Sequence, residues 1–300
     1  MSPTLSPDAA KYSSFVLPVL ANDGARCELI CVQPTSACRQ WLYWVPAMGV
    51  PARHYLPFAQ ALAAYGIAVA LHEWRGIGSS KVRAGRRSNW GYRELLRSDF
   101  PAGMAALRAH QPEASCWLGG HSLGGQLSVL YAGLHPLELA GLVLVASGAP
   151  YWREFPHGGL IRACYGLAPL LANLCGYLPG RRMGFGGNEA RAVIADWARS
   201  GRTGRYAASG MKQDLEAALA QLALPVLALR LQDDWFGPQA SLDWLLGKMP
   251  NADCSKGVIT SSDLDGKVAD HFGWMTVPRV LAVRIAAWMA GVTPPAAGDS

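Results

Sequence analysis

The sequence lacks a long apolar run: no stretch of about 18 apolar residues is free of charge. A transmembrane helix needs about 20 such residues, so no integral membrane segment is expected. The N-terminus, MSPTLSPDAAK, has no basic segment followed by an apolar core, and therefore shows no secretory signal. These two absences predict a cytoplasmic protein.

The sequence also has few charged residues, and its cysteines follow no recognised spacing pattern. Only 16% of the residues are charged, and the net charge of +6 is not gathered into a basic helix or an aromatic-basic motif, so no nucleic-acid partner is expected. The seven cysteines have neither metal-ligand nor disulfide-type spacing. We therefore expect reduced thiols and no bound metal.

The sequence does contain alternating apolar strands and amphipathic helices. Residues 13–33 alternate around Asn22-Asp23-Gly24, which predicts an antiparallel hairpin. Further strands are expected at 41–47, 67–74, 116–118, 139–147, 224–232 and 254–260, and helices at 55–65, 92–110, 123–134, 239–248 and 276–289. This order predicts an α/β fold, a mostly parallel sheet with helices on both faces.

The alternation stops between residues 148 and 210. This segment has no clear strand, but it contains helical pieces, one of them the amphipathic stretch Glu189–Arg199. We interpret 148–210 as a helical cap inserted into a discontinuous core of residues 13–147 and 211–292. Residues 1–12 and 293–300 are expected to be flexible tails.

The stretch Cys116–Gln126 (CWLGGHSLGGQ) holds the strongest motif. An apolar strand runs into Gly120-His121-Ser122-Leu123-Gly124, and a helical pattern begins after the serine. G-x-S-x-G at a strand-to-helix turn is the arrangement that exposes a nucleophilic serine. Ser122 as an ordinary helix cap is the alternative, and His121 is expected to pack beside the turn.

A serine hydroxyl needs a base, and the base needs an acid to orient it. In chains with this motif the acid and then the histidine follow the serine. His271 is the only histidine after residue 157, and Asp233-Asp234 follow the strand PVLALRLQ. Both Asp233 and Asp234 remain open as the acid, and either could be a turn residue and His271 a structural one.

The negative charge that forms on an acyl oxygen requires two backbone N–H donors. The expected donors are Leu123, directly after the serine, and Met48, in the loop after the strand at 41–47.

Together these motifs resemble the alpha/beta-hydrolase superfamily, in particular its lysophospholipase-like and serine-aminopeptidase-like bacterial members. The resemblance rests on residues 73–80 (EWRGIGSS), 120–125 (GHSLGG), 234–238 (DWFGP) and 271–273 (HFG). Relatives usually have Asp where Glu73 stands and His-Gly where Pro46-Ala47 stand. The resemblance, through the spacing from Asp234 to Pro238, favours Asp234 as the acid. The resemblance implies an acyl hydrolase without a cofactor, with a helical cap between the sixth and seventh strands.

The resulting prediction is a serine hydrolase of carboxylic esters or thioesters that forms an acyl-enzyme on Ser122. Its partner would be a small-molecule acyl substrate, lipid-like given the apolar cap. Acyl transfer or cofactor-free perhydrolysis by the same three residues is the alternative. A non-catalytic binding relative is a third reading, which the Ser, Asp and His set disfavours.

Overall fold

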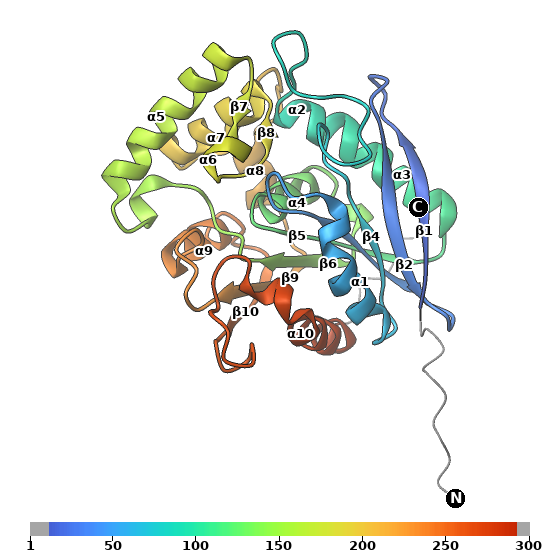
Figure 1. The fold of residues 1–300 in the computed structure, drawn as a ribbon. Coiled ribbons are helices and arrows are strands. Elements are labelled where there is room, and N and C mark those ends of the chain that lie inside the picture. Colours follow the sequence, from blue (N-terminus) through green and yellow to red (C-terminus); the bar gives the residue numbers. More distant parts are fainter. Residues whose placement is uncertain (1–11, 293–300) are drawn as a thin grey trace, which may run out of the picture.

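The computed structural model describes residues 12–292, and eight strands form its main sheet in the order β1-β2-β4-β3-β5-β6-β9-β10 (Figure 1). Their bounds are β1 Tyr12–Leu20, β2 Arg26–Pro34, β3 Gln40–Val45, β4 Ala68–Leu71, β5 Ser115–His121, β6 Gly141–Val145, β9 Pro225–Leu231 and β10 Asp253–Ile259. β2 pairs antiparallel with β1 and β4, and all other neighbours in this sheet are parallel. The prediction of a mostly parallel sheet is confirmed. Residues 1–11 and 293–300, most of the predicted tails, lie outside the described residues.

The N-terminal hairpin forms where the sequence predicts it. β1 and β2 pair in register from Tyr12 opposite Pro34 to Leu20 opposite Arg26. Gly24 closes the turn with φ +84°, a conformation that costs little only for glycine.

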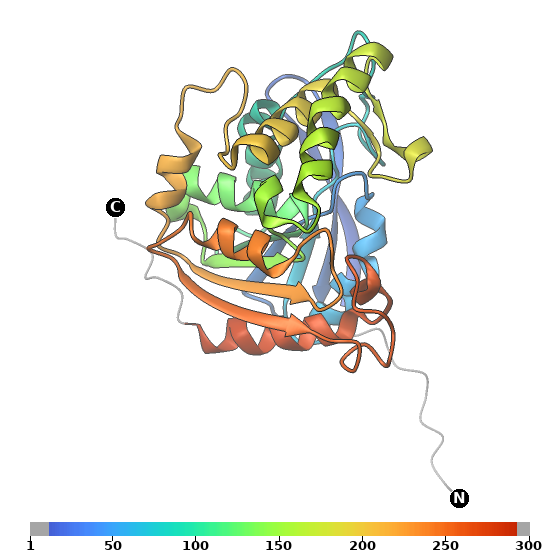
Figure 2. The ribbon, with the colours of Figure 1, turned by 90° about the vertical axis from the view of Figure 1, so that its left-hand side faces the viewer.

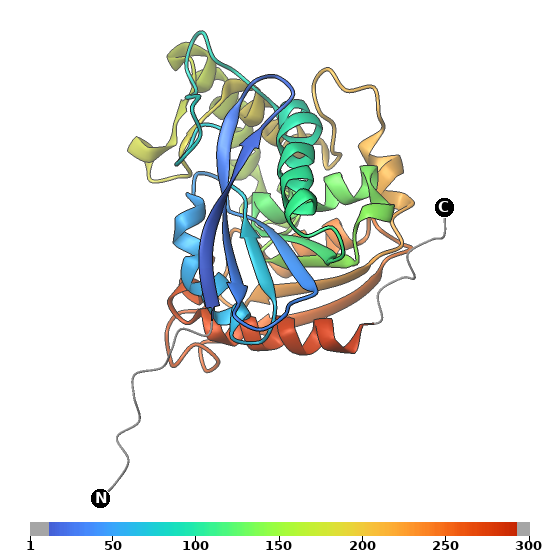
Figure 3. The ribbon, with the colours of Figure 1, turned by 90° about the vertical axis from the view of Figure 1, so that its right-hand side faces the viewer.

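Helices cover both faces of the sheet. α1 (Leu56–Ala63) and α10 (Pro278–Gly291) bury Phe58 and Leu281 against one face. The other face is covered by α3 (Phe100–His110), α4 (Leu123–Leu134), α8 (Leu215–Ala220) and α9 (Gln239–Leu246). Figure 3 shows α3 and α10 on opposite sides of the sheet. The short helix α8 was not predicted from the pattern, although Asp214 caps it by accepting hydrogen bonds from two backbone N–H groups.

The helix predicted for residues 92–110 contains a π-helical turn at Leu95–Asp99 between α2 (Tyr92–Glu94) and α3. Phe100 N–H donates to Leu95 O, five residues back. Pro101 has no N–H and its ring crowds the preceding turn, so the ladder widens just before it.

The inserted segment contains α5 (Gly158–Cys175), α6 (Gly180–Met183) and α7 (Arg191–Thr203). It also contains a small antiparallel pair, β7 (Leu178–Pro179) and β8 (Asn188–Glu189), so the expectation of no strand there is wrong. Glu189 lies on β8 and not in the helix, which begins at Arg191. Within residues 12–292, α5 alone is long and apolar enough to cross a membrane by length and composition, and 11% of it is buried.

Candidate active site

Ser122 lies on a sharp turn between β5 and α4, with φ +57° and ψ −122°. A non-glycine residue rarely takes a positive φ, so this backbone is strained. The turn is possible because its neighbours lack side chains. A Cβ on Gly124 would lie 2.1 Å from Val45 O, and one on Gly120 would lie 2.5 Å from Gly124 C.

The loops after β9 and β10 bring Asp234 and His271 together. His271 Nδ1 and Asp234 Oδ2 are 2.8 Å apart, and both side chains are buried. Asp234 Oδ1 accepts hydrogen bonds from the backbone N–H groups of Phe236, at 2.9 Å, and Gly237, at 3.1 Å. The second oxygen of Asp234 is therefore aimed at the histidine ring.

Asp233 points elsewhere. Its Oδ2 accepts hydrogen bonds from Ser261 Oγ and Ala269 N–H, each at 3.2 Å. Asp233 thus ties together the two loops that follow β9 and β10, while its neighbour Asp234 contacts the histidine.

His271 contacts the residue before Ser122 but is not hydrogen-bonded to Ser122 itself. Within residues 12–292 no hydrogen bond joins the Ser122 hydroxyl to His271; the two are linked through His121, whose ring lies 4.9 Å from the His271 ring. Such bonds are often long in enzymes without substrate and shorten in the complex.

The two predicted oxyanion donors are unpaired. In the described part of the chain, neither Met48 N–H nor Leu123 N–H donates to another group of the protein. The neighbouring N–H, that of Ala47, donates to Tyr55 Oη at 2.9 Å. Trp74 Nε1 holds the same loop by donating to Pro46 O at 3.2 Å and Ala47 O at 3.0 Å.

A buried hydrogen-bond chain links this loop to His271. His121 Nε2 donates to His271 O at 2.9 Å, which leaves His121 Nδ1 as the acceptor for the Tyr55 hydroxyl at 2.8 Å. Tyr55 Oη in turn accepts from Ala47 N–H. Burial holds the pKa of His121 well below its usual value, so the ring is neutral, as these donor and acceptor roles require.

The inserted segment lies directly on the Met48 loop. A Cβ on Gly49 would lie 1.9 Å from Gly187 N, and Met48 packs against a cluster of the insertion formed by Ala172, Leu178 and Ile194. The gap between Met48, Leu123 and the insertion's Glu189 is only about 10 Å³. This volume is barely enough for one water molecule.

Glu189 is a buried carboxyl beside these donors. It accepts a hydrogen bond from Gly187 N–H at 3.0 Å, and within residues 12–292 it forms no ion pair. Burial raises its pKa to about 7.

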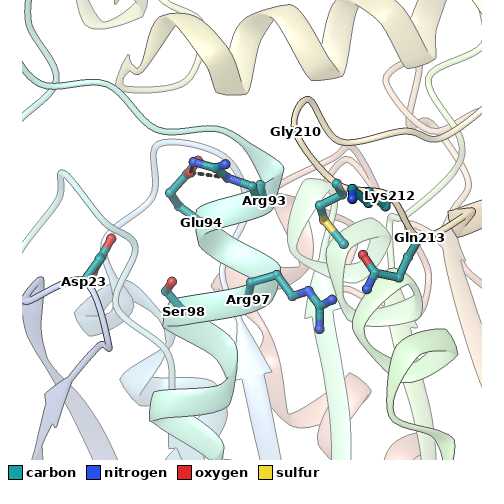
Figure 4. A pocket seen from close by; sticks show the side chains of 9 residues that line it. Asp23, Arg93, Glu94, Arg97, Ser98, Gly210, Lys212 and Gln213 are labelled. Carbon is teal, nitrogen blue, oxygen red and sulfur yellow. Dashed lines mark hydrogen bonds and ion pairs between the residues drawn. The ribbon is translucent and has the colours of Figure 1, made fainter.

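A larger cavity, of about 550 Å³, lies between residues 93–98, in α2 and the π-helical turn, and residues 210–213. Figure 4 shows Arg93, Arg97 and Ser98 on one wall and Lys212 and Gln213 on the facing one. Since none of the predicted site residues lines it, its size does not make it the catalytic site.

Three contributors were not identified from the sequence: Tyr55, Glu189 and the bonding role of His121. Tyr55 and Glu189 belong to none of the motifs, and their contacts at the site follow only from the fold. His121 lies within the G-x-S-x-G motif, but the motif does not predict that its ring contacts His271 O, 150 residues further along the chain.

Comparison with known proteins bears on the fold and the family. A family model described as "Serine aminopeptidase, S33" matches residues 37–184. A search of curated proteins found no match.

Solved structures of esterases and lipases share the fold. A bacterial membrane phospholipase A is 18% identical, with a TM-score of 0.61, over 94% of this chain and 87% of that one. A monoacylglycerol lipase from Paleococcus ferrophilus is 16% identical, with a TM-score of 0.61, over 88% and 99%. A thermophilic esterase from Thermogutta terrifontis is 18% identical, with a TM-score of 0.58, over 93% and 99%. The sheet, the turn at Ser122 and the family match together place this chain among the hydrolytic enzymes of the alpha/beta-hydrolase superfamily.

Proposed function

We propose that the protein is a serine hydrolase that cleaves carboxylic esters or thioesters through an acyl-enzyme. The observation that carries the proposal is the 2.8 Å contact between His271 Nδ1 and Asp234 Oδ2, next to a serine held at φ +57°. A buried aspartate paired with a histidine, and a serine on a sharp strand-to-helix turn, are the groups that this chemistry requires. The esterase and lipase neighbours are consistent with it.

In the proposed mechanism, Ser122 Oγ attacks the acyl carbon and His271 Nε2 takes its proton. Asp234 holds the proton of His271 Nδ1 and stabilises the imidazolium. The acyl oxygen becomes negative and accepts hydrogen bonds from Met48 N–H and Leu123 N–H. His271 then gives its proton to the departing alkoxide or thiolate, leaving an ester on Ser122.

Water completes the cycle. His271 takes a proton from water as the oxygen attacks the Ser122 ester, and returns it to Ser122 Oγ when the acid leaves. An alcohol or hydrogen peroxide in place of water would give acyl transfer or perhydrolysis from the same acyl-enzyme.

We assign residues 148–210 as a cap over a core of residues 13–147 and 211–292. The gap of about 10 Å³ beside Met48 and Leu123 is too small for an acyl group, and we propose that the cap shifts away from the Met48 loop when substrate binds. All seven cysteines are unpaired, which agrees with the proposed location in the reducing cytoplasm.

The test is a panel of p-nitrophenyl esters graded by acyl length, assayed with wild type, Ser122→Ala and Ser262→Ala. Ser262 is an exposed serine outside the proposed triad, so its variant is the matched control. We expect Ser122→Ala to lose hydrolysis of every ester and Ser262→Ala to retain it. Activity that survives in folded Ser122→Ala would refute the assignment, and products made only with an added alcohol would favour the transferase.

A further inference from the structure

The helix α5 exposes an apolar face to solvent. It is the outermost helix of the inserted segment (Figures 1 and 2), and Leu160, Leu167, Leu170 and Leu174 are each at least 61% exposed. Their spacings of seven, three and four residues place them on one side of the helix. Clustered leucines on a surface usually mark a contact with a partner or a membrane.

The opposite face of α5 belongs to the fold. Tyr165 and Ala172 are buried, and Ala168, Leu171 and Ala172 pack in the cluster that includes Met48. The leucine face and the oxyanion loop thus lie on the two sides of one helix.

Residues 148–210 account for most of the net positive charge of the chain. Residues 148–210 hold eight arginines and no lysine, against three acids, so they carry +5 of the net +6. Two of the acids, Glu189 and Asp196, are buried. Within the described residues, Arg199 is the only one of the eight arginines that pairs with a carboxylate.

Arginines lie at both ends of α5. Arg153 and Arg162 stand over the Trp152 ring, with their guanidinium carbons 5.2 and 5.5 Å from its centre. At the other end Arg86 donates to Leu174 O at 2.6 Å. Guanidinium groups that flank an exposed apolar face complement lipid phosphates.

We propose that α5 docks on the surface of an anionic lipid bilayer, with its leucine face in the interface and the flanking arginines at the phosphates. The helix lies in the plane of the interface, because its inner face is packed in the protein and Arg162 interrupts its apolar sequence. Docking would place the Met48 loop about one helix diameter, roughly 10 Å, from the lipid. The proposal goes beyond ester hydrolysis and does not depend on it.

Co-sedimentation with vesicles tests the proposal. The full chain is mixed with vesicles of phosphatidylcholine alone, or of phosphatidylcholine and phosphatidylglycerol in equal parts. We expect binding to the anionic vesicles, at least tenfold weaker binding to the neutral ones, and a marked loss at about 0.5 M NaCl, where charge interactions are screened.

Two double variants separate the apolar contribution of the leucines from the electrostatic contribution of the arginines. The double variant Leu167→Ser/Leu170→Ser should lose at least tenfold in binding, while the control Val16→Ser, which changes an equally exposed apolar residue on β1, should bind as wild type. Arg153→Gln/Arg162→Gln, which removes the two guanidinium groups beside Trp152, should weaken binding to anionic vesicles only. Hydrolysis of a short soluble ester should be unchanged in all variants, so a failure of docking is distinguishable from a failure of the proposed function.

Three results would overturn the proposal. One is equal binding to neutral and anionic vesicles, or none to either. Another is full binding by the leucine double variant. The third is a wild-type dimer in sedimentation velocity that the leucine variant converts to monomer, which would make a second copy the occupant of the face.

Discussion

Asp234→Asn gives a sharp test of the proposed triad because the structure dictates how the new amide must sit. Two backbone N–H groups, those of Phe236 and Gly237, point at Oδ1 of Asp234. The asparagine must keep its oxygen there, since an NH2 group would face two donors. Its NH2 then points at His271 Nδ1.

An NH2 donor at this position requires His271 Nδ1 to be unprotonated. The ring proton moves to Nε2, where it faces Ser122, and the histidine can no longer accept the serine proton. In serine proteases the equivalent change lowers kcat by about four orders of magnitude, which corresponds to about 5.5 kcal/mol in the barrier. We expect a loss of similar size here.

Asp233→Asn is the matched control. Asp233 is exposed and contacts Ser261 and Ala269, so its variant should lose less than about tenfold in kcat, with a small effect on stability. The assay is kcat for a p-nitrophenyl ester at neutral pH, with thermal unfolding to verify that both variants fold. A crippled Asp233→Asn beside a nearly normal Asp234→Asn would refute the acid assignment.

Three further substitutions test the surroundings of the site. The pKa of Glu189 is raised to about 7 from 4.5, so the folded state holds its proton longer than the unfolded state; the free energy of unfolding should fall by about 3 kcal/mol as pH rises from about 4.5 to about 7. Glu189→Gln should lack this fall. The measurement is the free energy of urea unfolding of wild type and Glu189→Gln below and above this pH range, and the same pH dependence in both proteins would contradict the burial argument. Tyr55→Phe should leave Ala47 N–H and His121 Nδ1 without partners, at about 1–3 kcal/mol each, and should lower kcat more than it changes KM; unchanged kcat would show that the buried chain does not position the site. Gly124→Ala would place a methyl group 2.1 Å from Val45 O and should unfold the turn or abolish activity, and a stable, active variant would contradict the steric account.

The sequence predicted the features that are local or periodic. The hairpin at Asn22–Gly24, the strand order along the chain and the turn at Ser122 each depend on residues close together in sequence, and the structure contains all of them. The choice between Asp233 and Asp234 was harder, because both follow the same strand and only their direction differs.

Other features depend on contacts that no short pattern encodes. The π-helical turn lies just before Pro101, which has no N–H to donate within a helix whose other residues favour helical structure. Glu189 looked like the first residue of an amphipathic helix, yet pairing with Leu178 places it on a strand and buries it. The Tyr55–His121 link joins residues 66 positions apart, so it follows only from how the short 3-10 helix Ala52–Tyr55, just before α1, packs against the sheet.

The most direct test of the central claim is to locate the covalent adduct formed with a fluorophosphonate, which reacts with an activated serine as an acyl ester would. Wild-type protein is labelled, digested and analysed by peptide mass spectrometry. We predict one adduct per chain, on Ser122, and none in Ser122→Ala or in Asp234→Asn treated for the same short time. An adduct on another residue, or no adduct in a protein that hydrolyses esters, would contradict the account.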